Sequence, residues 1–170
     1  MNDLAEALRQ NRAAVAELLA AAEGAHAEWA QPPAPGKWSP AQLVEHVARA
    51  LEQSGRVIAG QPSDFPTFPR LVRPVLRGIF FNKVLKRGRF PGGARTNTAL
   101  DPATGPATPA EARVRLEAAL GTLEQAARSR GAGEQRANST IFGWVPLPDY
   151  VMFQAIHTRH HCRRLPAAPR

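Results

Sequence analysis

The residues of this chain best suited to chemistry are three histidines near the C-terminus, within residues 156–162. His157 and His161 are four residues apart, so on a helix both imidazoles project from one face, about 5–6 Å apart. At that spacing two neutral imidazoles can share one metal ion, each about 2.0–2.1 Å from the metal. A third ligand must come from another helix. His46 is the natural candidate, because it lies in the only other stretch that resembles a comparable helix face.

These residues alone leave two questions open. His160 is three residues from His157 and shares its face as well, although an apolar stripe that continues to Leu165 favours His161. A histidine on an apolar helix face is also commonly a core residue with satisfied hydrogen bonds. Burying three imidazoles together without a shared partner would, however, leave polar nitrogens unpaired at about 1–3 kcal/mol each. A metal ion removes that cost by binding one nitrogen of each ring.

Other reactive side chains are predicted to be secondary. Cys162 is turned about 100° from His161 around a helix axis, so we expect it to pack rather than to serve as a fourth ligand. His26 is expected at the surface, near the end of the first helix. Glu45 and Asp149 are candidate helpers of a reaction, with Glu45 expected to face solvent.

The elements that must position the histidines are helices. A first helix is predicted from residue 4 to about residue 29. Ser39 begins a second helix with a capping box to Gln42. Apolar residues then follow with helical spacing, and His46 falls among them on the inward side. Gly60 ends this helix.

Three further helices are predicted downstream. The third begins near Arg73, and a loop over residues 90–109 separates it from a helix that Thr108 caps. The last helix begins near Pro148 and holds two histidines on one apolar face. No strand pattern is convincing. We therefore predict one all-α domain over residues 1–170, an antiparallel four-helix bundle with an additional helix and long loops.

Composition limits the classes of function. An apolar fraction of 44% is typical of a globular protein rather than a disordered one. The single cysteine excludes an intramolecular disulfide. The N-terminus has no signal-peptide pattern, and no apolar run approaches the length of about 18 residues that a membrane span needs. We expect a cytoplasmic protein without a membrane span.

The formal net charge of +8 needs an explanation. Basic charge attracts nucleic acid and anionic lipid. The excess is largely arginine and accompanies 16 prolines, so a GC-rich coding bias is the simpler interpretation, and we expect no specific nucleic-acid partner. The basic segment 70–95 is interpreted as the solvated back of a core helix that could steer an anionic substrate. Binding of this amphipathic segment to a membrane or a partner is the alternative.

Taken in order along the chain, a set of residues resembles the DinB-like (YfiT-type) superfamily. The resemblance extends from the second predicted helix to the C-terminus. The residues that carry it are Trp38, Ser39, Pro40, Leu43, His46, Phe142, Gly143, Phe153, His157, His161 and Leu165.

The resemblance implies a four-helix bundle, often a homodimer, with a three-histidine site for nickel or zinc. It implies metal ligands at His46, His157 and His161, and so favours His161 over His160. Some relatives transfer low-molecular-weight thiols such as mycothiol or bacillithiol, and others isomerise maleylpyruvate.

Two departures from the superfamily pattern concern the substrate and leave the three ligands untouched. Close relatives often have His-Pro where this chain has Thr140 and Ile141. They also often have glutamine after the last ligand, where this chain has Arg164.

The expected function is that of a metal-dependent enzyme acting on a small molecule. Three imidazole ligands with an open position are typical of a catalytic metal site, since a structural site is closed by four protein ligands. Such a metal lowers the pKa of a bound water or thiol. We therefore expect a thiol S-transferase or a hydrolase. The alternative is a non-catalytic metal- or ligand-binding helical-bundle protein.

Overall fold

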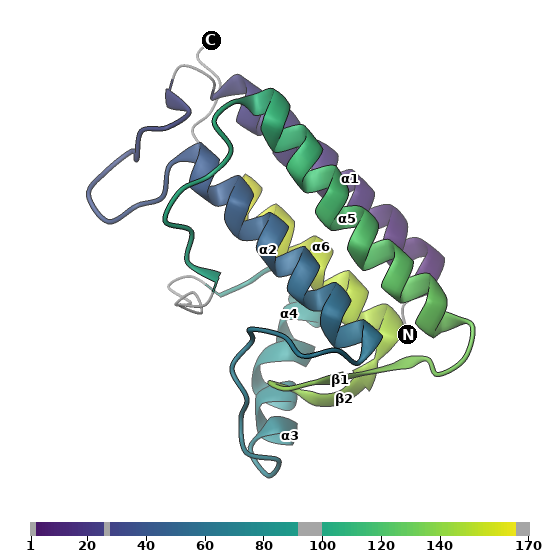
Figure 1. The fold of residues 1–170 in the computed structure, drawn as a ribbon. Coiled ribbons are helices and arrows are strands. Elements are labelled where there is room, and N and C mark those ends of the chain that lie inside the picture. Colours follow the sequence, from purple (N-terminus) through teal and green to yellow (C-terminus); the bar gives the residue numbers. More distant parts are fainter. Residues whose placement is uncertain (1–2, 26–27, 92–99, 166–170) are drawn as a thin grey trace.

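Four long helices lie side by side in the computed structural model, which describes residues 3–25, 28–91 and 100–165 (Figure 1). They are α1 (Leu4–Gly24), α2 (Pro40–Ala59), α5 (Pro109–Gly131) and α6 (Leu147–Cys162). α2 makes its most extensive contacts with α5, and α1 with α6. The prediction of a mostly helical protein is confirmed. α1 is shorter than expected, because it ends at Gly24 rather than near residue 29.

The predicted helix starts are present. At the start of α2, the backbone N–H of Gln42 donates to Ser39 Oγ at 3.3 Å, and the Ser39 N–H donates to Gln42 Oε1 at 3.0 Å. This is the capping box expected from the sequence. At the start of α5, Thr108 Oγ1 accepts from the Glu111 N–H at 3.2 Å. Each cap satisfies a donor that the first helical turn leaves unpaired.

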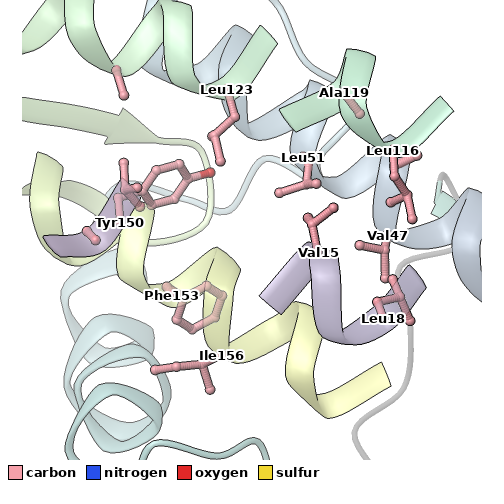
Figure 2. Packing of buried hydrophobic residues seen from close by; sticks show 14 of the residues in the cluster. Val15, Leu18, Val47, Leu51, Leu116, Ala119, Leu123, Tyr150, Phe153 and Ile156 are labelled. Atoms are coloured by element: carbon pink, nitrogen blue, oxygen red, sulfur yellow. The ribbon is translucent and has the colours of Figure 1, made fainter. Parts of the chain in front are cut away.

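The core lies between the long helices. In Figure 2, Val47 and Leu51 of α2 lie beside Val15 and Leu18 of α1. Leu123 of α5 belongs to the same cluster, and all five side chains are buried. Because α2 is apolar on this side along its whole length, its inward face is set firmly, and that face carries His46.

A short antiparallel hairpin precedes α6 and was not predicted. It consists of β1 (Arg136–Ser139) and β2 (Gly143–Pro146). Ala137 pairs with Val145, and both side chains are buried. Gly143 has a φ of 71°, a left-handed conformation that glycine adopts without steric cost. The prediction that the chain forms no strands is therefore wrong for this hairpin.

The basic segment lies to one side of the long helices (Figure 1). Its helical part runs through α3 (Arg73–Leu76), a π-helical stretch (Arg77–Phe81) and α4 (Asn82–Arg87). Phe81 and Val84 are buried, as a core helix requires. Val75 and Ile79, however, are exposed. The interpretation of this segment as a core helix with only a basic back is therefore wrong for half of its apolar stripe.

The chain over residues 100–108 lies against the first turns of α2. Trp29 Nε1 donates to the Pro106 carbonyl at 2.8 Å. Gly105 allows the closest approach, because a Cβ atom there would lie 2.1 Å from the carbonyl oxygen of Ala41. A glycine is needed here for space.

The contact at Gly105 gives a direct test of this packing. Gly105→Ala is expected to lower the free energy of unfolding by about 1–3 kcal/mol, because the new methyl group must push the chain away from α2. Gly121→Ala is the matched control, since nothing lies near a Cβ there and the position is within α5. That variant should gain up to about 1 kcal/mol from better helix propensity. Urea unfolding measures both, and an unchanged stability of Gly105→Ala would contradict the close contact.

Candidate metal centre

Three histidine side chains from two helices meet at one point. His46 comes from α2, and His157 and His161 come from adjacent turns of α6. Nε2 of His157 lies 3.3 Å from Nε2 of His46 and 3.1 Å from Nε2 of His161. The ligand atoms of the three rings all lie within 4.8 Å of one another. The structure thus brings together the three residues that the sequence singled out.

The separations between these nitrogens fit a single metal ion. A metal–nitrogen distance of about 2.0–2.1 Å at a tetrahedral angle separates two ligand nitrogens by about 3.3 Å. The two shortest Nε2–Nε2 distances, 3.1 and 3.3 Å, agree with this value. Imidazole ligands suit zinc and nickel among the divalent metals. The donor set therefore fits such a cation.

Hydrogen bonds alone cannot satisfy the three rings. His46 Nδ1 lies 3.0 Å from the Leu100 carbonyl oxygen, and donating to that oxygen leaves Nε2 of the neutral ring with a lone pair. Nε2 of His157 faces two other Nε2 atoms, yet one imidazole nitrogen either donates one hydrogen or offers one lone pair. One hydrogen can form only one well-aligned hydrogen bond, so at least one of the two close contacts lacks a hydrogen bond of its own. His161 Nδ1 is also buried without a hydrogen-bond partner among the described residues. A cation facing three lone pairs removes this conflict.

Two partners of His46 were not predicted. The indole ring of Trp38 lies 4.7 Å from the His46 ring and 6.1 Å from the His161 ring, between centroids. Trp38 directly precedes the capping box that begins α2, and this position could have predicted that its ring packs near His46. The Leu100 carbonyl has no such signal, because it is a backbone atom 54 residues away. Together they fix the orientation of His46.

Burial keeps the three rings neutral. It lowers the pKa of His46, although the hydrogen bond to Leu100 raises it in part. Burial and then the neighbouring His46 hold the pKa of His157 well below its usual value. Burial, followed by His157, lowers the pKa of His161 in the same way. Neutral imidazole is the form that binds metal, so the site is ready for a cation at neutral pH.

The other candidates near the cluster lie outside it. His160 stands beside the site, where its ring lies 5.4 Å from that of Phe90, but it is not among the three converging rings. Cys162 is half-buried and is likewise not part of this group. His26 lies outside the described residues.

The two carboxylates proposed as helpers are occupied or distant. Glu45 was expected to face solvent, but it pairs with Arg49 at 2.9 Å and with Arg115 of α5 at 3.0 Å. Asp149 lies in the first turn of α6. It is eight residues before His157, which places it about 12 Å away along the helix axis.

A cavity of about 180 Å³ opens beside the histidines. Its wall is mostly aromatic and includes Phe80, Phe90 and Phe153. Arg164, at the position where relatives often have glutamine, lines it as well and supplies a positive charge. His157 also lines the cavity, so a ligand in it lies next to the candidate metal position.

The neutral state of the buried rings predicts an acid-sensitive fold for the metal-free protein. Below about pH 6.5 the unfolded chain protonates His157 and His161, whereas burial keeps both neutral in the folded state. The unfolded state then binds more protons than the folded state. As the pH is lowered below about 6.5, the free energy of unfolding should therefore fall by about 1.4 kcal/mol per pH unit for each of these two histidines. Urea unfolding across this range measures the slope. A slope that survives in the double variant His157→Phe, His161→Phe would contradict this assignment.

Comparison with known proteins places the chain in a family. No curated protein and no solved structure matches it. The DinB superfamily matches over residues 7–165, a range that includes all three converging histidines. Because this match covers nearly the whole sequence, the chain belongs to the DinB superfamily.

Proposed function

We propose that the protein is a metal-dependent enzyme whose zinc or nickel ion is held by His46, His157 and His161. The observation that supports this most directly is the convergence of three Nε2 atoms in a buried place. Three protein ligands leave at least one position of a tetrahedral ion open to water or substrate, as in catalytic sites.

A divalent cation at this position supplies Lewis acidity that lowers the pKa of a nearby thiol or water. Residues of the chain contribute the rest. The hydrogen bond to Leu100 holds His46 with its Nε2 lone pair directed inward. The wall of the cavity is mostly apolar, and a low local polarity strengthens electrostatic interactions. Arg164 offers a charged donor to an anionic group of a substrate.

Transfer of a low-molecular-weight thiol to an apolar electrophile is the reaction that this cavity favours. Phenylalanine rings offer apolar contact to an electrophile. Among the described residues that line the cavity there is no aspartate or glutamate to act as a general base. A thiol, with a pKa near 8.5, needs less help to lose its proton than water, with a pKa of about 15.7. Hydrolysis is therefore the second candidate.

The architecture that we propose follows from the same family. Packing of four long helices around one buried cluster supports a four-helix bundle. Residues of all four helices, of the hairpin and of the basic segment share one buried cluster, which supports a single domain over residues 1–170. A homodimer is the assembly expected of the superfamily.

α1 and α5 run in opposite directions, because Arg12 pairs with Glu124 and Glu23 with Arg113. The expectation of a wholly antiparallel bundle is wrong for the two most extensive contacts. α1 runs in the same direction as α6, and α2 in the same direction as α5, as the contacts Glu17–Arg159 and Glu45–Arg115 indicate.

The metal assignment predicts different results for two neighbouring histidines. His157→Ala should lose stoichiometric zinc or nickel, because it removes the central ligand of the three. It should also lose most of the thermal stabilisation that metal gives, about 2.7 kcal/mol when free metal is at 100 times Kd. His160→Ala is the matched control and should keep both. Native mass spectrometry and thermal unfolding measure these effects, and metal retained by His157→Ala would refute the site.

The enzymatic assignment predicts metal-dependent thiol transfer. With a small thiol and a generic apolar electrophile, removal of the metal or His46→Ala should lower the rate about a hundredfold or more. Arg164→Gln should raise KM for an anionic thiol and leave kcat nearly unchanged, since the arginine serves binding. Disappearance of the electrophile measures the rate. Tight metal binding without any turnover would instead support the non-catalytic binding protein.

A further inference from the structure

The whole net charge of the protein is carried by one segment. Residues 65–100 contain eight of the 22 basic residues and none of the 14 acidic ones. The remainder of the chain therefore has 14 of each and is formally neutral. A coding bias acts on the whole chain, so it does not account for this segregation. The cluster of charge needs a cause within the segment itself.

The basic residues of the segment also differ in their partners. On the long helices, arginines are neutralised by carboxylates, as in the pairs Arg12–Glu124 and Arg159–Glu17. In the segment, no ion pair with a carboxylate of the described residues is formed by Arg70, Arg73, Arg77, Lys83, Lys86, Arg87 or Arg89. This surface is therefore available to an anionic partner.

Large apolar side chains are exposed in the same place. Leu71 is 90% exposed, Ile79 64% and Val75 57%. Trp144 of β2 is also exposed, and it lines a surface pocket together with Arg70, Arg73 and Arg77. Exposed apolar side chains beside unpaired cations are the pattern of a helix that binds a membrane surface.

We propose that residues 68–89 dock the protein on an anionic membrane surface. Leu71, Val75 and Ile79 enter the boundary between headgroups and acyl chains, and the surrounding lysines and arginines contact anionic headgroups. Docking of this kind lies in the interface and needs no span. None of the helices in the described ranges has the length and apolar content required to cross a bilayer.

Other occupants fit this face less well. In a two-fold dimer the same patch would meet itself, so the basic residues of one copy would oppose those of the other. The phosphates of nucleic acid would pair with the cations, but they would leave Leu71 and Ile79 without apolar contact. An anionic bilayer supplies both the charge and the apolar phase.

The docking face also adjoins the cavity beside the histidines. Phe80 and Phe90 line that cavity, and both also line a surface pocket whose other residues include Lys83 and Arg87. Docking does not depend on the metal, so it can be tested separately from the proposed reaction.

Vesicle binding tests the proposal. The full-length protein should co-sediment with vesicles of phosphatidylcholine mixed with phosphatidylglycerol and not with vesicles of phosphatidylcholine alone. Binding should weaken as salt is raised, because the attraction of basic residues to anionic lipid is screened.

Four exposed positions provide matched variants. Ile79→Glu should lower the partition coefficient about tenfold or more, because it removes a buried apolar contact and adds a negative charge. Val114→Glu, at an equally exposed valine on α5, should bind as the wild type does. Lys83→Glu should weaken binding about fivefold or more. Arg56→Glu, on the exposed surface of α2, should have little effect.

Several outcomes would overturn the proposal. Failure of the wild type to bind the mixed vesicles does so directly, as does unchanged binding by Ile79→Glu. Self-association of the wild type that Ile79→Glu abolishes, without vesicle binding, would assign this face to a second copy. Circular dichroism and metal content of each variant report whether the fold is intact.

Discussion

The arrangement of three imidazole nitrogens in a buried place is the constraint on which the rest of the structure depends. Nε2 of His157 lies close to both Nε2 of His46 and Nε2 of His161. It can form a well-aligned hydrogen bond with only one of them. The packing of α2 and α6 must hold the rings together against this conflict. Apolar residues such as Val47 and Leu51, on the same helix as His46, supply that packing. A bound cation would turn the conflict into attraction, so metal binding would be coupled to folding.

Much of the structure around this point serves to orient one ring. The residues after Leu100 are held in place by the hydrogen bond from Trp29 and by the close approach of Gly105 to Ala41 of α2, and they keep the Leu100 carbonyl beside His46. The indole ring of Trp38 packs against the same ring. Contacts of this kind determine which nitrogen carries the hydrogen, and so which one is free to bind metal. The long loops are thus part of the site.

What could be predicted from the sequence is what depends on local patterns. The cap at Ser39 and the spacing of His157 and His161 follow from single turns of helix, and both are present. The hairpin was missed because two strands of four residues show too little alternation. The Leu100 carbonyl could not be found, since any residue offers a carbonyl. The exposure of Ile79 was missed because an apolar helical stripe has the same sequence pattern whether it faces a core or a membrane.

The separation of charge connects the proposed docking face with the proposed metal site. A low-molecular-weight thiol is dissolved in water, whereas an apolar electrophile concentrates in lipid. An enzyme docked by its basic segment would meet both at the boundary. Phe80 and Phe90 form part of the wall between the basic surface and the cavity, so an apolar molecule leaving the bilayer would have a short path to the histidines. The neutral long helices would then face the solution, from which the thiol arrives.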